Sequence, residues 1–152
     1  MDEDELVATI GHRFPGGRAC IEPYVDWLLR DIVLADRFAG PSTGDLHPTA
    51  AFLAAQRGVG MELEEIFALF GAASADGPML GEWAVDYARP LRAGVGYTVR
   101  AVVENAVRRR GARTGVFDVV TLLIELVGDD GAVHAAVRPS YVFPRRSGGR
   151  AA

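Results

Sequence analysis

The fold is decided by the stretch Gly58-Val59-Gly60-Met61-Glu62-Leu63-Glu64-Glu65-Ile66-Phe67-Ala68-Leu69-Phe70-Gly71-Ala72-Ala73. After its first turn this predicted helix has no wide polar face, and a helix that is apolar on nearly every side lies inside a protein. Three glutamates in its opening turns complement the positive end of the helix dipole. Almost everything that follows is typical of β-strand. The sequence therefore predicts an α+β fold in which an antiparallel sheet wraps around one long buried helix.

The strands are predicted from the alternation of apolar and polar side chains. Trp83, Val85 and Tyr87 mark the apolar face of a half-buried strand over about residues 80–87. Three further strands are predicted over about residues 97–106, 114–127 and 132–142. A basic turn at 108–113 and a hairpin signal at 128–131 separate them.

The residues before the long helix are expected to form shorter elements. A helical pattern covers about residues 24–38, with Asp26 on its solvent-facing side, and is expected to end near Gly40-Pro41. A short alanine-rich helix is predicted over 49–56, and a weak strand or strand pair lies within residues 6–23. We expect one domain over residues 1–146 and a mobile tail over 147–152.

Bulk composition narrows the classes of function. The 152 residues are 49% hydrophobic and 24% charged, which is ordinary for a soluble globular protein. The net charge of −4 argues against a nucleic-acid partner. No apolar run approaches the about 18–20 residues that cross a membrane, and the acidic start is unlike a signal peptide. Cys20 is the single cysteine, so we expect no disulfide, no metal site and a cytoplasmic location.

Three local motifs resemble those of the MaoC-like hydratases and dehydratases, which have the hotdog fold. Thr43-Gly44-Asp45-Leu46-His47-Pro48 resembles that family's loop T-G-D-x-N-P-x-H, and Gly60-Met61 resembles the H-G-M that opens its buried helix. Val85-Asp86-Tyr87-Ala88-Arg89-Pro90-Leu91-Arg92-Ala93-Gly94 resembles its strand and turn F/Y-x-x-P-x-x-x-G-D. The resemblance covers about residues 24–143 and implies a hotdog domain that binds acyl thioesters.

The sequence also departs from the family's pattern. The family's catalytic pair is the aspartate of the loop and the histidine five positions later. Asp45 matches the aspartate, but the position five later is Ala50. His47 stands where the family has asparagine, and Gly96 stands near the place of its aspartate. The resemblance therefore implies thioester binding more firmly than hydratase chemistry.

Hydration of a 2-enoyl thioester needs a base for water, an acid for the α-carbon and a donor for the developing enolate oxygen. The resemblance implies Asp45 and His47 as the acid/base pair, with Gly60 and Met61 forming the oxyanion and substrate-binding site. Asp45, His47 and Gly60 each have a purely structural interpretation as well. Asp45 is a potential helix cap, His47 a surface turn residue, and Gly60 a packing glycine.

Three functions remain open at this stage. The leading hypothesis is a 2-enoyl hydratase or 3-hydroxyacyl dehydratase that acts on an acyl-CoA or a carrier-protein thioester. The second is a non-catalytic partner subunit of a MaoC-like heterodimer, for which Ala50 is the motivating residue. The third is an acyl thioesterase that uses Glu62, Glu64 or Glu65 to activate water. A binding module for an apolar ligand is a further alternative.

The resemblance also implies partners. Hotdog domains pair through their sheets, so we expect a homodimer or a heterodimer with another hotdog chain. No cofactor is expected beyond the coenzyme A or phosphopantetheine of the substrate thioester, and an acyl carrier protein is a further candidate partner. Arg108-Arg109-Arg110 is interpreted as a solvated turn, with phosphate binding as the alternative.

Overall fold

The computed structural model describes residues 1–35 and 44–145. Its helices are α1 (Glu3–Val7), α2 (Pro23–Ile32), α3 (Ala50–Gly58), α4 (Leu63–Leu69) and the 3-10 turn η1 (Ser74–Asp76). Its strands are β1 (Gly17–Cys20), β2 (Met79–Tyr87), β3 (Gly96–Gly111), β4 (Gly115–Val127) and β5 (Val133–Arg145). The predicted tail at 147–152, the domain end at 146 and the helix end near Gly40-Pro41 lie outside the described residues.

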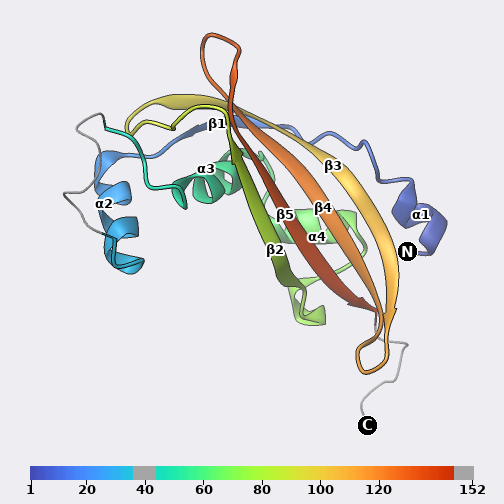
Figure 1. Ribbon diagram of the computed structural model, residues 1–152. Coiled ribbons are helices and arrows are strands. Elements are labelled where there is room, and N and C mark those ends of the chain that lie inside the picture. Colours follow the sequence, from blue (N-terminus) through green and yellow to red (C-terminus); the bar gives the residue numbers. More distant parts are fainter. Residues whose placement is uncertain (36–43, 146–152) are drawn as a thin grey trace.

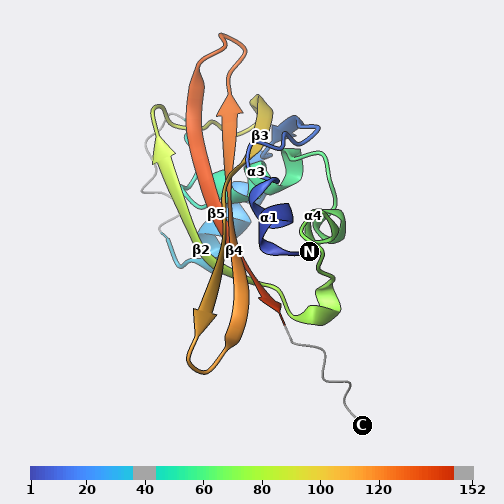
Figure 2. The ribbon, with the colours of Figure 1, turned by 90° about the vertical axis from the view of Figure 1, so that its right-hand side faces the viewer.

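The strands form one antiparallel sheet in the order β1-β3-β4-β5-β2 (Figure 1). Strands β3, β4 and β5 are long and occupy the middle, whereas β1 and β2 are the two edges. Helices α3 and α4 lie on one side of the sheet (Figure 2). This arrangement confirms the predicted α+β fold, in which a curved antiparallel sheet covers helical structure.

The helix at the centre of the sheet is α3, because it contacts β1, β3, β4 and β5. Its buried residues are all small, namely Ala50, Ala51, Ala54, Ala55 and Gly58. Gly58 shows how close the approach is, since a Cβ placed there would lie 2.1 Å from Cγ2 of Val99 on β3. Small side chains therefore allow α3 to sit directly against the concave face.

The predicted long helix over residues 58–73 is wrong in its bounds. The chain forms two helices there, because α3 ends at Gly58 and α4 covers only Leu63–Leu69. Gly60 lies between them with a φ of +81°, a left-handed conformation that breaks a helix and favours glycine. The apolar end of the segment is buried as expected, with the rings of Phe67 and Phe70 packed against Phe143 on β5.

Other elements differ more modestly from the predictions. The weak strand expected within residues 6–23 is β1 at Gly17–Cys20, whereas Glu3–Val7 form α1, because Asp2 and Glu5 cap its first turn reciprocally. The helix expected over 24–38 ends at Ile32, and Leu34 has a φ of +54°. The basic segment expected as a turn over 108–113 is largely strand, since β3 continues to Gly111.

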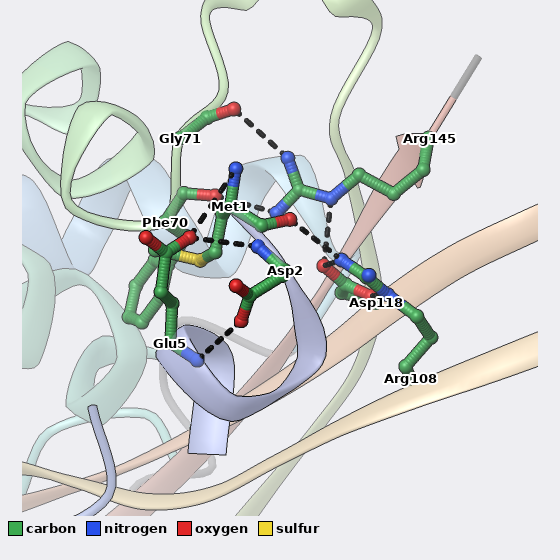
Figure 3. Close-up of polar contacts among 8 residues, drawn as sticks. All are labelled: Met1, Asp2, Glu5, Phe70, Gly71, Arg108, Asp118 and Arg145. Atoms are coloured by element: carbon green, nitrogen blue, oxygen red, sulfur yellow. Dashed lines mark hydrogen bonds and ion pairs between the residues drawn. The ribbon is translucent and has the colours of Figure 1, made fainter. Parts of the chain in front are cut away.

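A buried carboxylate joins the sheet to the N-terminus and to the end of α4 (Figure 3). Asp118 on β4 is fully buried and accepts hydrogen bonds from Nε of Arg108 at 2.7 Å and from Nε of Arg145 at 2.6 Å. Arg108 also donates to Met1 O, and Arg145 donates to the carbonyl oxygens of Phe70 and Gly71. Burial alone would raise the pKa of Asp118, but the two guanidinium groups bring it below its ordinary value.

Candidate functional site

The structure brings together two of the three motifs that carry the family resemblance. Asp45 pairs with Arg92 as an isolated antiparallel bridge, and the backbone N–H of Leu46 donates to Leu91 O at 2.8 Å. The loop before α3 is therefore held against the turn after β2. Thr43, the first residue of the loop motif, lies outside the described residues.

Helix α2 fixes the shape of this loop. Asp26 accepts a hydrogen bond from the backbone N–H of His47 at 2.6 Å and another from Nε of Arg30 at 2.7 Å. Arg30 in turn donates to Asp45 O at 3.0 Å. The side chain of Asp26 is only 13% exposed, so the interpretation of this residue as solvent-facing is wrong. One aspartate and one arginine of α2 thus hold both candidate catalytic residues by their backbones.

One oxygen of the Asp45 carboxylate lacks a hydrogen-bond donor in the described chain. Its Oδ1 atom is buried and accepts no hydrogen bond from any described residue, although Nε of Arg92 lies 3.7 Å away. Asp45 borders a cavity of about 310 Å³, which we call the Asp45 cavity, together with Leu46, Pro48, Tyr87, Arg89 and Leu91. Tyr87 closes one side by donating its hydroxyl to Pro48 O at 2.5 Å, and burial raises its pKa to about 12.

The imidazole of His47 is engaged locally. Its Nδ1 lies 2.8 Å from Oγ1 of Thr49 and accepts a hydrogen bond from the backbone N–H of Thr49 at 3.3 Å. A nitrogen that accepts from a backbone N–H carries no proton of its own, so we assign the ring hydrogen to Nε2. His47 is not among the residues that line the Asp45 cavity.

Ala50, at the position of the family's histidine, is fully buried at the first turn of α3. Its backbone N–H donates to His47 O at 2.9 Å, which closes the turn that leads into the helix. Its side chain belongs to the core and is not part of the lining of the Asp45 cavity. The family's pairing of a loop aspartate with a histidine five residues later is therefore absent from the described residues.

Gly60 and Met61 lie in a second hollow. They border an open groove of about 600 Å³, the outer groove, together with Gln56, Arg57, Glu62 and Glu65. Neither Asp45 nor His47 lines it. The N-cap of α4 is Glu62, two residues after Gly60. The expectation that Gly60 opens a buried helix is therefore wrong. Its close neighbour is Gly16, whose carbonyl oxygen lies 2.4 Å from the place of a Cβ on Gly60.

Sequence reasoning missed Gln56. Its Oε1 accepts a hydrogen bond from the hydroxyl of Tyr141 on β5 at 3.1 Å, while its Nε2 is buried without a partner among residues 1–35 and 44–145. Gln56 borders both the outer groove and a third hollow of about 360 Å³, the inner cavity. The available signal was a polar residue one helical turn after Phe52, on an alanine-rich helix that has only one other polar side chain, Arg57.

The carboxylates of α4 have structural partners. Oε2 of Glu65 accepts from the backbone N–H of Glu62 at 2.8 Å. Glu64 accepts hydrogen bonds from both the hydroxyl and the backbone N–H of Ser74, and these bonds lower its pKa.

In the part of the chain that the structure describes, no group of three potential metal ligands occurs. No described helix is long and apolar enough to cross a membrane.

Comparison with known proteins identifies the architecture. No protein-family model matches the sequence, and no curated protein does. The ChsH1-ChsH2 complex from Mycobacterium tuberculosis is similar in structure, with a TM-score of 0.71 and 18% identity over 96% of this chain and 93% of that chain. The HadBC (3R-hydroxyacyl-ACP dehydratase) complex from the same organism has a TM-score of 0.67 and 14% identity over 88% of this chain and 96% of that one.

A MaoC-like dehydratase from Phytophthora capsici is also similar, with a TM-score of 0.59 and 14% identity. The match covers 97% of this chain and 50% of that chain. These identities are low, so the likeness concerns the backbone architecture. The sheet order, the small-residue helix against its concave face and these matches agree. The chain has the hotdog fold that MaoC-like dehydratases adopt.

Proposed function

We propose that this chain is one subunit of a two-chain hotdog assembly that hydrates 2-enoyl thioesters or dehydrates 3-hydroxyacyl thioesters. In this proposal it supplies acyl-binding surface, and the partner chain supplies the complete acid/base pair. The observation that carries the proposal is Ala50, which is fully buried in the core at the position where the family has its histidine. The proposed reaction needs no redox or metal cofactor, because it adds or removes water by proton transfer, and coenzyme A or phosphopantetheine enters as part of the substrate.

The chemistry explains why a single aspartate is insufficient. Addition of water across a conjugated double bond needs one group that removes a proton from water and another that protonates the α-carbon. Asp45 offers a carboxylate to its cavity. The nearest imidazole in sequence, His47, is turned toward Thr49. In this proposal Asp45 is the single member of the pair that the described site could supply.

The surface of the chain supports a partner. Strand β2 is an edge strand, and it carries four exposed apolar residues, Met79, Leu80, Trp83 and Tyr87, with exposed fractions of 56%, 44%, 39% and 40%. An apolar, unpaired edge is a surface that native proteins cover. Two of the similar structures are two-chain complexes by name, and one of these is a dehydratase. Pairing through β2 would cover this edge.

The test is turnover by the purified chain. We expect no hydration of a 2-enoyl-CoA and no dehydration of a 3-hydroxyacyl-CoA by the chain alone. We expect turnover when it is mixed with a hotdog chain that has an intact aspartate and histidine and that co-purifies with it. That turnover should fall when the partner's histidine is replaced and should persist with His47→Ala in this chain. Full turnover by the isolated chain would contradict the proposal.

A second candidate is catalysis by this chain itself, with Asp45 and His47 as the pair. It is favoured by the buried Oδ1 of Asp45, which accepts no hydrogen bond from the described residues and borders a cavity. In that case Asp45→Asn and His47→Ala would each abolish turnover by the isolated chain. Asp129→Asn is the matched control, because Asp129 is an exposed carboxylate paired with Arg18 far from the loop in sequence.

Thioester hydrolysis by α4 is less well supported. Glu64 has its pKa lowered by its bonds from Ser74, and a carboxylate with a lowered pKa is a weaker base for water. Glu65 caps its own helix. Release of free coenzyme A that Glu62→Gln abolishes would revive this alternative.

A further inference from the structure

We propose that Gln56 is the polar anchor of an acyl-thioester site formed by the outer groove and the inner cavity, with its Nε2 donating a hydrogen bond to the thioester carbonyl oxygen. This inference rests on the proposed function for the choice of a thioester as the occupant. Its test measures binding alone and does not depend on turnover.

The two hollows adjoin each other at Gln56. Both Gln56 and Leu63 line the outer groove and the inner cavity, so these residues mark the junction between them. The inner cavity is mainly apolar and is bordered by Phe52, Phe67, Leu80 and Tyr141. The outer groove is bordered by charged side chains, including Arg57, Glu62 and Glu65. A ligand that spans both hollows would be apolar at one end and polar at the other.

The junction contains a hydrogen-bond donor that has no partner in the described chain. A buried amide N–H without a partner is unfavourable, and native structures rarely leave one unsatisfied. The hydroxyl of Tyr141 occupies Oε1 of Gln56, which leaves Nε2 as the free donor within the described chain. Donors of this kind are matched by a carbonyl oxygen. An acyl thioester has a carbonyl between an apolar chain and a polar pantetheine arm. In the proposed site the apolar chain lies in the inner cavity, the carbonyl lies at Gln56 and the pantetheine arm lies in the outer groove.

Residues around Gln56 hold its position. Phe52, one helical turn earlier on α3, packs its ring against Trp83 at 5.2 Å between centroids. Tyr141 belongs to β5, and its ring contacts Phe67 at 6.1 Å. The amide is therefore placed by α3 and oriented by a strand residue. Asp45 does not line either hollow, which agrees with a chain that binds the acyl group while another chain performs the proton transfers.

The experiment compares two ligands on the purified chain by isothermal titration calorimetry. Octanoyl-CoA carries the thioester carbonyl and is saturated, so it cannot be hydrated. The thioether S-octyl-CoA has the same chain length and carrier but lacks the carbonyl oxygen. With the wild-type chain we expect octanoyl-CoA to bind about three- to tenfold more tightly, the range for one net hydrogen bond. Equal affinities would overturn the proposal without any variant.

Two variants locate the effect. Gln56→Met has nearly the same shape but no donor, so it should bring the two affinities within about twofold of each other, since one net hydrogen bond accounts for the whole preference. Arg57→Met is the matched control, because Arg57 is the next residue of α3, is exposed and also borders the outer groove. Loss of its charge affects both ligands equally, so the preference for octanoyl-CoA should stay intact. A preference that survives Gln56→Met overturns the assignment.

The site and the proposed function fail in different ways. Turnover assays are separate from these titrations. An inert assembly that keeps its carbonyl preference would contradict the proposed function and not this site. An active assembly whose chain binds both ligands equally would contradict this site and not the proposed function.

Discussion

Gly60 offers a direct test of whether its role is set by packing. Its φ is +81°, and an added Cβ would lie 2.4 Å from the carbonyl oxygen of Gly16. Gly77 is the matched control, because its φ is +74° and an added Cβ there meets nothing within 4 Å. Both Gly→Ala changes impose the same backbone strain, but only the change at Gly60 also forces two backbone segments apart.

The expected magnitudes follow from these two contributions. A left-handed alanine costs about 1–2 kcal/mol, and the reduced freedom of the unfolded chain returns about 0.4–1 kcal/mol. Gly77→Ala should therefore lower the free energy of unfolding by about 0–1.6 kcal/mol. At Gly60 the clash is with backbone, which cannot rotate away, and overpacking of this kind adds about 1–3 kcal/mol. Gly60→Ala should thus be less stable than Gly77→Ala by about 1–3 kcal/mol.

Urea unfolding followed by circular dichroism measures both values with the same baseline. The slope with denaturant should be unchanged, since neither change alters the surface exposed on unfolding. Equal destabilisation in the two variants would refute the reasoning, because it would mean that the contact between Gly16 and Gly60 is not close. The result also bears on catalysis, since a loss of thioester binding in Gly60→Ala counts in favour of an oxyanion role only after this stability effect is subtracted.

Three further outcomes are expected. Asp118→Asn should destabilise the fold by about 2–3 kcal/mol at pH 7, which is less than the full effect of breaking a buried pair because both arginines reach water. The pKa of Asp118 is lowered in the folded state, so its contribution to stability is present above the ordinary value of 3.8 and is lost as the pH falls through the folded-state pKa. The difference in unfolding free energy between wild type and variant should therefore shrink at pH values below 3.8. Phe67→Asp should unfold the chain in a thermal melt, because a buried unpaired carboxylate costs on the order of the whole stability, whereas Ala68→Asp on the exposed side of α4 should not. Leu80→Lys on β2 should weaken association with the partner chain in light scattering and change the unfolding free energy by less than about 0.5 kcal/mol; an unchanged assembly would place the interface elsewhere.

The strands were predictable because their signal is local. Alternation gave the positions of β2, β4 and β5 to within a few residues, and Gly128-Asp129-Asp130-Gly131 marked the hairpin between the last two. The central helix was not predictable by the same means. Apolar periodicity gives weight to large side chains. Because of Phe67 and Phe70, it predicted the central buried helix in the segment that contains α4. The concave face instead accepts the small residues of α3, because a helix can approach a curved sheet closely only where side chains are short.

The site was predictable only in part, for a related reason. The loop motif and the turn motif lie together, but Gly60 and the loop with Asp45 and His47 border different hollows, contrary to the single site that the resemblance implied. The role of Asp26 was hidden, because an aspartate on the polar side of a predicted helix gives no indication that a distant loop will supply an N–H. The free donor of Gln56 was hidden as well, since it depends on Tyr141 occupying the other end of the amide.

These two residues suggest how the chain separates binding from proton transfer. Asp26 and Arg30 fix the loop by its backbone, and Oδ1 of Asp45 has no hydrogen-bond donor among the described residues, although Arg92 lies 3.7 Å away. Gln56 presents its donor in a different hollow. If one substrate used both, its carbonyl and its reacting carbons would have to reach two cavities that share no lining residue. Under the proposed function, a substrate held at Gln56 would take its acid/base pair from a second chain, and the exposed apolar edge of β2, which borders the inner cavity through Leu80, is where that chain would dock.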